Sequence, residues 1–578
     1  MFDEKDLNRT DALSQCLTEI GGEMLPPPDL VKAAKAGVLL HRKVRTATHI
    51  RRFAGAVALY AACVVLFLGS VFVLAYVFEN VQSTSPVSTM PPIPPTSTTV
   101  TTQPPDSPPP ETEPGPEYPI QPDHFLEKIP DDLNFADMGL SNAERTVRIA
   151  YVEGTKGVYT KRSFQADVTG GTLVNNATKE RNQLLKDQLG LQISATMVSD
   201  RITGMQDELG AELAAGNCPY DILAGYQYFG VGMAQMGYML DLSDLSSYDA
   251  DFIDLSAPYW ANAYNEAMSY KGTYYWLTGD IALRYLGSAY CTFVNNELYD
   301  TYLSAEYGPI FDLVKNGDWT MDQMVVLSTE CYTRAQADQA TDIYGFGYEP
   351  NDSMDGLFFG AGMKLTQRDR DTKALTLILD QTDETYQAFT NQWLALTGGG
   401  GSKRYSDMDG EAVMGAFARG NLLFTTNQLH YADYYKVFET DYSVLPMPKL
   451  NADQKEYLTT IHNSCTVFGI YAFSQRIPQA AAALEFLCAH SNRSVREHFL
   501  DSLVPNYKDS ASQAEMIDLL YQGVTTDFAV VWGHSTDAII DLFRDYKKGV
   551  DNTVSRNRKK WLDNLDKFTQ SLDQLNPT

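Results

Sequence analysis

Paired cysteines, catalytic signatures and positive charge are all scarce in this sequence of 578 residues. The seven cysteines include no C-x-x-C pair, so the sequence gives no support for a zinc ribbon or a thioredoxin-like redox site. No H-E-x-x-H or G-x-S-x-G pattern occurs, and neither a zinc protease nor an α/β-hydrolase is indicated. The net charge of −28 opposes binding of nucleic acid, which is itself a polyanion.

The cysteines do not predict a disulfide framework. Cys16 and Cys63 fall before and inside a long apolar run, which leaves an odd number of cysteines in the rest of the chain. We expect these to be small buried hydrophobic residues, and a native disulfide stays open as the alternative.

Lys and Arg are also absent from residues 53–127, and this stretch begins with an apolar run. Residues 53–78 read FAGAVALYAACVVLFLGSVFVLAYVF, which is long enough as a helix to cross a bilayer core of about 30 Å. Basic residues precede the run: Arg42, Lys43, Arg45, Arg51 and Arg52. The sequence therefore predicts a single-pass protein of the cell membrane, with a cytoplasmic N-terminus and an extracellular C-terminal domain.

Composition divides the chain further. Residues 1–52 are a short cytoplasmic segment with a charge of +2, which leaves −30 for the remainder. Residues 79–144 are an extracellular stalk rich in Pro, Ser and Thr, which favours extended polyproline II structure and cannot bury a core. Its Pro-, Ser- and Thr-rich part, residues 83–123, is a semi-rigid spacer, on the order of 100 Å long at about 3.1 Å per residue. Residues 145–578 are predicted to form the outer domain.

The outer domain begins with strands that alternate with helices. Predicted strands cover residues 145–154, 191–198 and 220–226, and amphipathic helices that end at glycine cover residues 176–190 and 202–216. This alternation predicts an α/β fold with a mainly parallel sheet, in which ligands meet the carboxyl ends of strands.

The end of the third predicted strand is the first place to look for a ligand. Gly225 would let a ligand approach the backbone, and Tyr226 and Tyr228 would offer aromatic faces. The tyrosines would equally well cap the sheet, and both interpretations stay open.

Five segments resemble, in order, those of extracellular solute-binding proteins of family 1, the maltose-binding type. They are DILAGYQYFGVGMAQMGYMLDL, KGTYYWLTGDIALRYLGSAYCTFVNNELYD, NGDWTMDQM, ARGNLLFTTNQLHYADYYKVFETDYSVLPMPKL and AAAALEFLCAH. The resemblance spans about residues 145–575, and its weight lies in the order of the set rather than in any single motif.

The resemblance implies a two-lobed, periplasmic-binding-protein-like (type II) ectodomain preceded by one transmembrane helix. Lobe 1 would hold about residues 146–278 and 463–490, and lobe 2 about residues 282–459 and 491–575. The hinge would lie near residues 277–281 and 459–463. A small solute, a sugar first among the candidates, would bind in the cleft between the lobes for an ABC transporter permease. No enzyme activity and no cofactor are implied.

Residues in the ligand-facing turns are the candidate contacts, although a structural role is open for each. They are Tyr226, Tyr228, Asp280, Asp355, Asn427, Gln428, His430, Asn463 and Trp532. His430 and His462 lie near the proposed crossings, but no ligand spacing supports a metal site.

Two features depart from the family pattern. Most such proteins in Gram-positive bacteria carry a lipid on an N-terminal cysteine, whereas this chain has an apolar helix, a stalk and an inner segment. A transmembrane sensor that reports solute binding to the cytoplasmic segment is therefore the alternative function. A glycoside hydrolase with paired carboxylates is the third class considered, and no signature supports it.

Overall fold

The computed structural model describes most of the chain after residue 125. The described residues are 126–153, 159–167, 171–350, 352–369, 372–378, 384–406, 410–437, 440–503, 510–531 and 550–575. The chain divides into a unit of residues 1–110 and a unit of residues 111–578, and every described residue belongs to the second. The predicted cytoplasmic segment, membrane helix and most of the stalk lie outside the described residues. Within them, no helix combines the length and the apolar character needed to span a bilayer.

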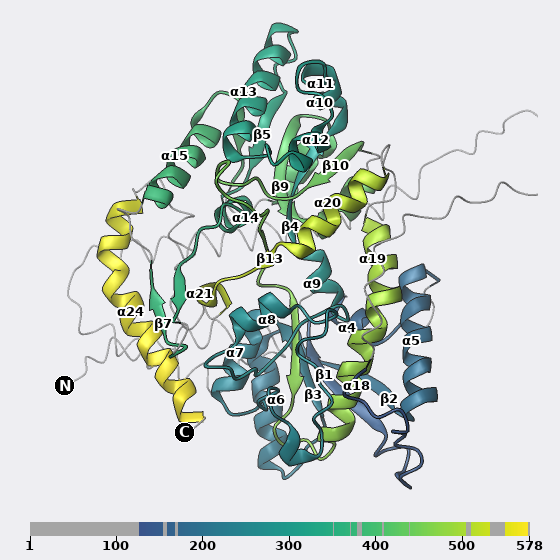
Figure 1. Cartoon of the computed structure of the whole chain (residues 1–578). Coiled ribbons are helices and arrows are strands. Elements are labelled where there is room, and N and C mark those ends of the chain that lie inside the picture. Colours follow the sequence, from purple (N-terminus) through teal and green to yellow (C-terminus); the bar gives the residue numbers. More distant parts are fainter. Residues whose placement is uncertain are drawn as a thin grey trace, which may run out of the picture. The chain divides into compact units, whose positions relative to one another are not determined.

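The first sheet has the strand order β12-β3-β1-β2 (Figure 1). Its strands are β1 (Thr146–Val152), β2 (Gln192–Ser199), β3 (Ile222–Tyr226) and β12 (Thr466–Ile470). β1 is parallel to β2 and β3, which confirms the predicted parallel sheet, whereas β12 is antiparallel to β3.

Helices and short turns connect and cover the first sheet. They are α4 (Tyr159–Phe164), α5 (Leu173–Leu189), α6 (Ile202–Ala214), α7 (Gln227–Gln235), η2 (Ser246–Tyr248), α8 (Asn262–Met268), α18 (Ile477–His490), η4 (Ser491–Val495) and α19 (Arg496–Leu503). The end of α5 shows why the sequence stops there. Gly190 adopts a left-handed φ of 69°, and a Cβ at this position would lie 2.7 Å from the Ala136 nitrogen. Only glycine fits this turn without strain.

The second sheet has the order β10-β4-β9-β5-β8. Its strands are β4 (Tyr290–Asn295), β5 (Tyr344–Tyr348), β8 (Ser402–Arg404), β9 (Leu422–Gln428) and β10 (Tyr442–Leu445). β9, β5 and β8 run parallel, and β4 runs antiparallel to both of its neighbours.

The chain between these strands forms the helices of the second lobe. They are α10 (Asn296–Tyr302), α11 (Ser304–Tyr307), α12 (Ile310–Lys315), α13 (Met321–Ala337), α14 (Asp352–Gly360), α15 (Glu384–Gly398), α16 (Gly410–Ala418), η3 (Leu429–Tyr431), α17 (Ala432–Val437) and, from later in the chain, α20 (Ser510–Gln522). Successive side chains of β4 enter different cores. Tyr290 and Val294 belong to one hydrophobic cluster, whereas Cys291 and Phe293 belong to the other. Both faces of the second sheet are therefore covered, as expected for a sheet with parallel strands.

Within the described residues, two connections join the sheets, through residues 277–283 and 459–466. Leu277 bridges Phe468, and Ala289 bridges Ile461, so the two connections lie beside each other. Short elements complete this region: α9 (Leu283–Gly287), β11 (Thr459–Thr460), β13 (Val524–Thr525) and α21 (Phe528–Val531). A hairpin of β6 (Thr366–Arg368) and β7 (Leu375–Leu377), and the C-terminal helix α24 (Val550–Leu575), lie outside the two sheets.

The contacts of the last hundred residues differ from the predicted lobe boundary. α18 continues through η4 into α19, and both later elements pack against α5 of the first lobe. The fully buried guanidinium of Arg181 fixes this arrangement, because its Nη1 donates to the Ser491 hydroxyl at 2.8 Å. α20 packs on β10 in the second lobe, whereas α24 reaches α7 in the first. The predicted assignment of residues 491–575 to lobe 2 therefore fits only part of this stretch.

Candidate ligand-binding site at the junction of the two sheets

The carboxyl ends of the first sheet meet the second connection. β3 ends at Tyr226, and the first residue of β12, Thr466, lies directly opposite it. The following residue, Gln227, begins α7 and donates its backbone N–H to the Cys465 carbonyl at 3.0 Å. The edge where α/β sheets bind ligands is therefore also the edge where the chain enters from the second lobe.

The carboxyl end of β9 brings the second sheet to the same connection. Gln428, the last residue of β9, lies opposite Tyr290, the first residue of β4. His462 donates its backbone N–H to the Ser288 carbonyl at 3.0 Å, and its ring meets the Tyr290 ring edge-on at 6.0 Å. Residues at strand ends of both sheets thus converge on residues 459–466.

Buried amide and hydroxyl groups at this junction lack partners within the protein. The Gln227 side chain is 0% exposed, and neither its Oε1 nor its Nε2 is hydrogen-bonded in the part of the chain that the structure describes. The Gln428 Oε1 and the Ser288 hydroxyl share this property there. Because an unpaired buried polar group costs about 1–3 kcal/mol, such groups call for an explanation, and an external hydrogen-bonding partner supplies one.

Two predicted contact residues, Asp280 and Asn427, are bonded within the protein. The Asp280 carboxylate accepts a hydrogen bond from the Asn492 amide and pairs with the Arg496 Nε at 3.5 Å. Burial raises the pKa of Asp280, and Arg496 opposes this rise. The Asn427 Oδ1 accepts the Gln428 backbone N–H at 2.8 Å. Their ligand contacts stay predictions.

His430 is held as a neutral ring. Its Nδ1 lies 3.0 Å from the Gly287 carbonyl, and the ring stacks on Tyr431 at 4.4 Å. Burial, with the nearby Arg284 charge, lowers the pKa of His430 to about 3. Across the described residues no group of three or more potential metal ligands gathers, and His430 has an evident structural role.

The remaining predicted residues lie at different depths. Tyr226 is half-buried and packs against the first hydrophobic cluster, and Tyr228 is the second residue of α7. Asp355 is half-buried in α14, and Asn463 is half-buried in the turn before β12. Trp532 lies outside the described residues.

The short helix α4 was not predicted from the sequence. It links the carboxyl end of β1 to both connections between the sheets. The Glu153 carboxylate, directly after β1, accepts the Thr160 backbone N–H at 2.8 Å at the start of α4. The Thr160 hydroxyl lies 3.1 Å from that of Thr466, and the Ser163 hydroxyl accepts the Leu283 N–H at 3.1 Å. An acidic residue placed directly after a buried strand was the available signal.

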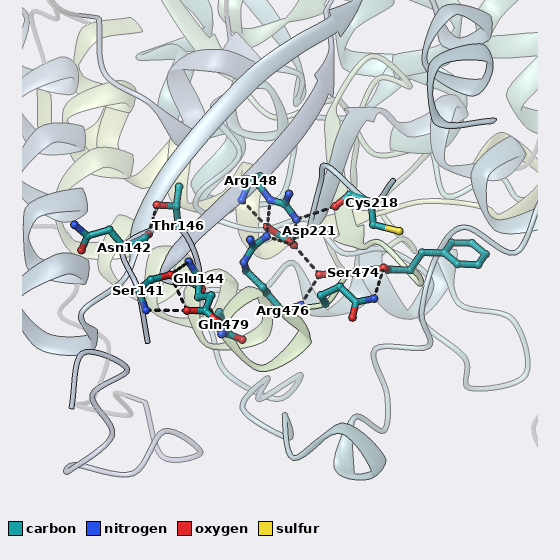
Figure 2. Close-up of polar contacts among 12 residues, drawn as sticks. Ser141, Asn142, Glu144, Thr146, Arg148, Cys218, Asp221, Ser474, Arg476 and Gln479 are labelled. Atoms are coloured by element: carbon teal, nitrogen blue, oxygen red, sulfur yellow. Dashed lines mark hydrogen bonds and ion pairs between the residues drawn. The ribbon is translucent and has the colours of Figure 1, made fainter. Parts of the chain in front are cut away.

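The dense charge cluster of the first lobe lies elsewhere. Asp221 precedes β3 and is 0% exposed, and its carboxylate binds Arg148 at 2.9 Å and the Ser474 hydroxyl at 2.8 Å (Figure 2). Arg476, just before α18, approaches both carboxylate oxygens at 3.4 Å. This cluster fastens α18 to the amino end of β3, the opposite end of the strand from Tyr226. The junction combines neutral amides and hydroxyls with charged groups, among them Arg284, whose Nη2 donates to the Ser464 hydroxyl at 3.1 Å.

Comparison with known proteins gives matches among solved structures only. No family model matches the chain. No curated protein matches it. The matched structures are substrate-binding proteins of the kind that the sequence motifs resemble. The galacto-N-biose/lacto-N-biose I-binding protein of an ABC transporter from Bifidobacterium longum is 13% identical, with 73% of this chain and 97% of that chain covered and a TM-score of 0.48.

Two further matches are of the same kind. The sugar-binding protein MalE from Xanthomonas citri is 12% identical, with 74% of this chain and 97% of that one covered and a TM-score of 0.48. The GacH receptor of Streptomyces glaucescens, solved with and without acarbose, is also 12% identical, with 74% and 98% covered and a TM-score of 0.45. The two-lobed organisation of this chain follows from its own strand order and its two connections.

Proposed function

We propose that the outer domain binds a small solute, a carbohydrate, between its two lobes and closes around it by movement at residues 277–283 and 459–466. The observation that carries the proposal is the set of buried, unpartnered polar groups at the junction, above all Gln227. Amides donate and accept hydrogen bonds without charge, which suits the hydroxyl groups of a neutral sugar. Closure requires only that the solute bind the closed arrangement more tightly than the open one.

A thermal-shift screen of the purified protein tests this proposal. The panel would contain mono- and oligosaccharides, amino acids, peptides and polyamines. A solute that binds only the folded state adds about 2.7 kcal/mol of stability at a hundredfold excess over its Kd. The expected result is a shift with a saccharide that Gln428→Met weakens and Gln183→Met, a change in an exposed glutamine of α5, leaves alone. No shift with any member of the panel would reject solute capture.

We further propose that residues 53–78 anchor the protein in the cell membrane and that the domain serves an ABC importer. The uninterrupted apolar run and the five basic residues before it support the anchor and its orientation. Labelling of Cys16 with a membrane-impermeant maleimide in a Cys218→Ser variant, which lacks the partly exposed cysteine of the outer domain, tests the orientation. Labelling is expected only after the cells are permeabilised, and labelling of intact cells would contradict it.

A further inference from the structure

A hairpin from the second lobe reaches the first lobe. Leu365 and Leu377 at its base belong to the hydrophobic cluster of the second lobe. Asp527 fixes the same base, because its carboxylate accepts the Leu365 N–H at 2.8 Å and the Thr366 N–H at 2.9 Å. β6 and β7 pair as antiparallel strands, with Thr366 opposite Leu377. The base of the hairpin is therefore anchored in the second lobe.

Arg368, the last residue of β6, binds the end of α8 in the first lobe. Its Nη2 donates to the Ser269 carbonyl at 2.6 Å and lies 3.3 Å from the Ala267 carbonyl and 3.4 Å from the Glu266 carbonyl. Its Nη1 lies 3.4 Å from the Ser269 hydroxyl. Carbonyls at a helix C-terminus lack intrahelical partners and carry partial negative charge, which favours a guanidinium.

α8 is an integral part of the first lobe rather than a loose segment. The Asn265 side chain exchanges two hydrogen bonds of 2.9 Å with the backbone of Thr278, at the start of the first connection. The Tyr264 hydroxyl lies 3.1 Å from the Cys465 sulfur, beside the second connection. α8 therefore contacts both connections as well as Arg368.

The C-terminal helix α24 makes the same crossing beside the hairpin (Figure 1). Trp561 belongs to the cluster of the second lobe. Phe568 and Leu572 belong to the larger cluster, which holds the core of the first lobe and also second-lobe residues such as Phe293. The Ser571 hydroxyl accepts a hydrogen bond from the Gln235 amide of α7 at 3.0 Å. Arg558 joins α24 to the hairpin through the Leu377 carbonyl at 3.4 Å.

The Phe528 ring lies close to both the hairpin and α24. The Arg368 guanidinium lies 5.9 Å from the centre of the Phe528 ring, and the Phe568 ring of α24 lies 6.1 Å from the same ring. We propose that the β6–β7 hairpin and α24 form a clasp between the lobes, with Arg368 as its charged link. The clasp holds the lobes in the arrangement seen here and must release at Arg368 before the lobes separate. This inference rests on the proposed movement of the lobes.

Single-molecule distance measurements on the full chain without solute test the clasp. Dyes would be attached through Met236→Cys, just after α7, and Leu394→Cys in α15, whose native side chains are 45% and 46% exposed. Cys16→Ser, Cys63→Ala and Cys218→Ser remove the cysteines that are not shown to be buried, and the other four are buried. The two labels report the separation of the lobes on the side of α24.

The expected result is a rise of about tenfold in the population with widely separated labels in Arg368→Ala, because hydrogen bonds to a charged group are lost. Arg368→Lys retains the charge but not the fork of donors, so a smaller rise is expected. Arg201→Ala, at an exposed arginine before α6, should change nothing. An unchanged distance distribution in folded Arg368→Ala overturns the clasp. If that variant fails to fold, an unchanged distribution in Arg368→Lys does so.

These measurements are independent of solute capture. The distances are recorded without any solute, so a failed clasp leaves the thermal-shift result standing. Conversely, a protein that binds no member of the panel would still show whether Arg368 holds the lobes together.

Discussion

The Tyr259 hydroxyl donates a hydrogen bond of 2.5 Å to the carboxyl group of Glu485, a side chain with an exposed fraction of 0%. The Trp260 Nε1 donates to the other carboxyl oxygen at 3.0 Å. Glu485 lies in α18, so these bonds fasten that helix to the segment before α8. Two donors favour the charged carboxylate, but desolvation outweighs them and raises the pKa of Glu485 to about 7.

Stability is therefore expected to depend on pH through Glu485. The pKa of Glu485 in the folded protein exceeds the ordinary value of 4.5. The contribution of Glu485 to the free energy of unfolding is therefore fully present below pH 4.5 and is lost as the pH rises through about 7. The whole change is on the order of 3 kcal/mol. Urea unfolding at pH 5 and pH 8 measures it, with Glu485→Gln as the comparison. Equal pH dependence in parent and variant would rule out Glu485 as the source.

The buried amide of Gln227 is expected to serve binding at the expense of stability. Gln227→Met keeps the volume and removes two unpartnered polar atoms, so the free energy of unfolding should rise by about 1–2 kcal/mol. The affinity for the solute found in the screen should fall about tenfold. Urea unfolding and titration calorimetry provide the two values. A loss of stability above about 1 kcal/mol would show that the amide has a partner in the folded protein.

Asp280 is expected to stabilise the fold through Arg496. Asp280→Ala leaves the Arg496 charge largely buried without its carboxylate, which should cost about 2–4 kcal/mol of unfolding free energy. Arg496→Ala should cost a similar amount, and the double variant should cost clearly less than the two together. Additive losses in this double-mutant cycle, combined with a weaker solute affinity in Asp280→Ala, would instead favour the predicted ligand contact.

The Asp221 cluster of Figure 2 should matter for stability alone. Asp221→Asn removes the charge that two arginines share in a buried position, and a loss of about 3 kcal/mol is expected. Solute affinity should not change, because the cluster lies at the amino end of β3. Chemical denaturation and solute titration check the two parts, and a selective loss of affinity would contradict the assignment.

Local patterns predicted the beginning of the domain well. The strand that became β1, the glycine stop at Gly190 and the parallel pairing with β2 all follow from periodicity and turn chemistry within about fifty residues. The resemblance also pointed to the residues around Gln428, where the second sheet meets the connections. Such features depend on neighbours in the sequence, and the sequence displays those neighbours directly.

Features that depend on distant partners were not predictable in the same way. Asp280 was expected at a crossing between the lobes and Gln428 after a strand, but the partner of Asp280 lies more than two hundred residues later on α19. The Gln227 side-chain amide has no hydrogen-bonding partner within the described residues, and only the packed structure reveals this. Arg368 sits in an ordinary polar stretch, and its acceptors become apparent only when α8 ends beside it.

The antiparallel pairing of β12 with β3 also constrains how the domain is made. β3 is complete at Tyr226, yet the strand that covers its edge begins at Thr466, after the whole second sheet has been synthesised. Until β12 has been synthesised, the first lobe presents an unpaired edge at β3, and such long-range closures are slow and prone to aggregation. The sheet of the first lobe can thus be completed only after all strands of the second sheet have been synthesised.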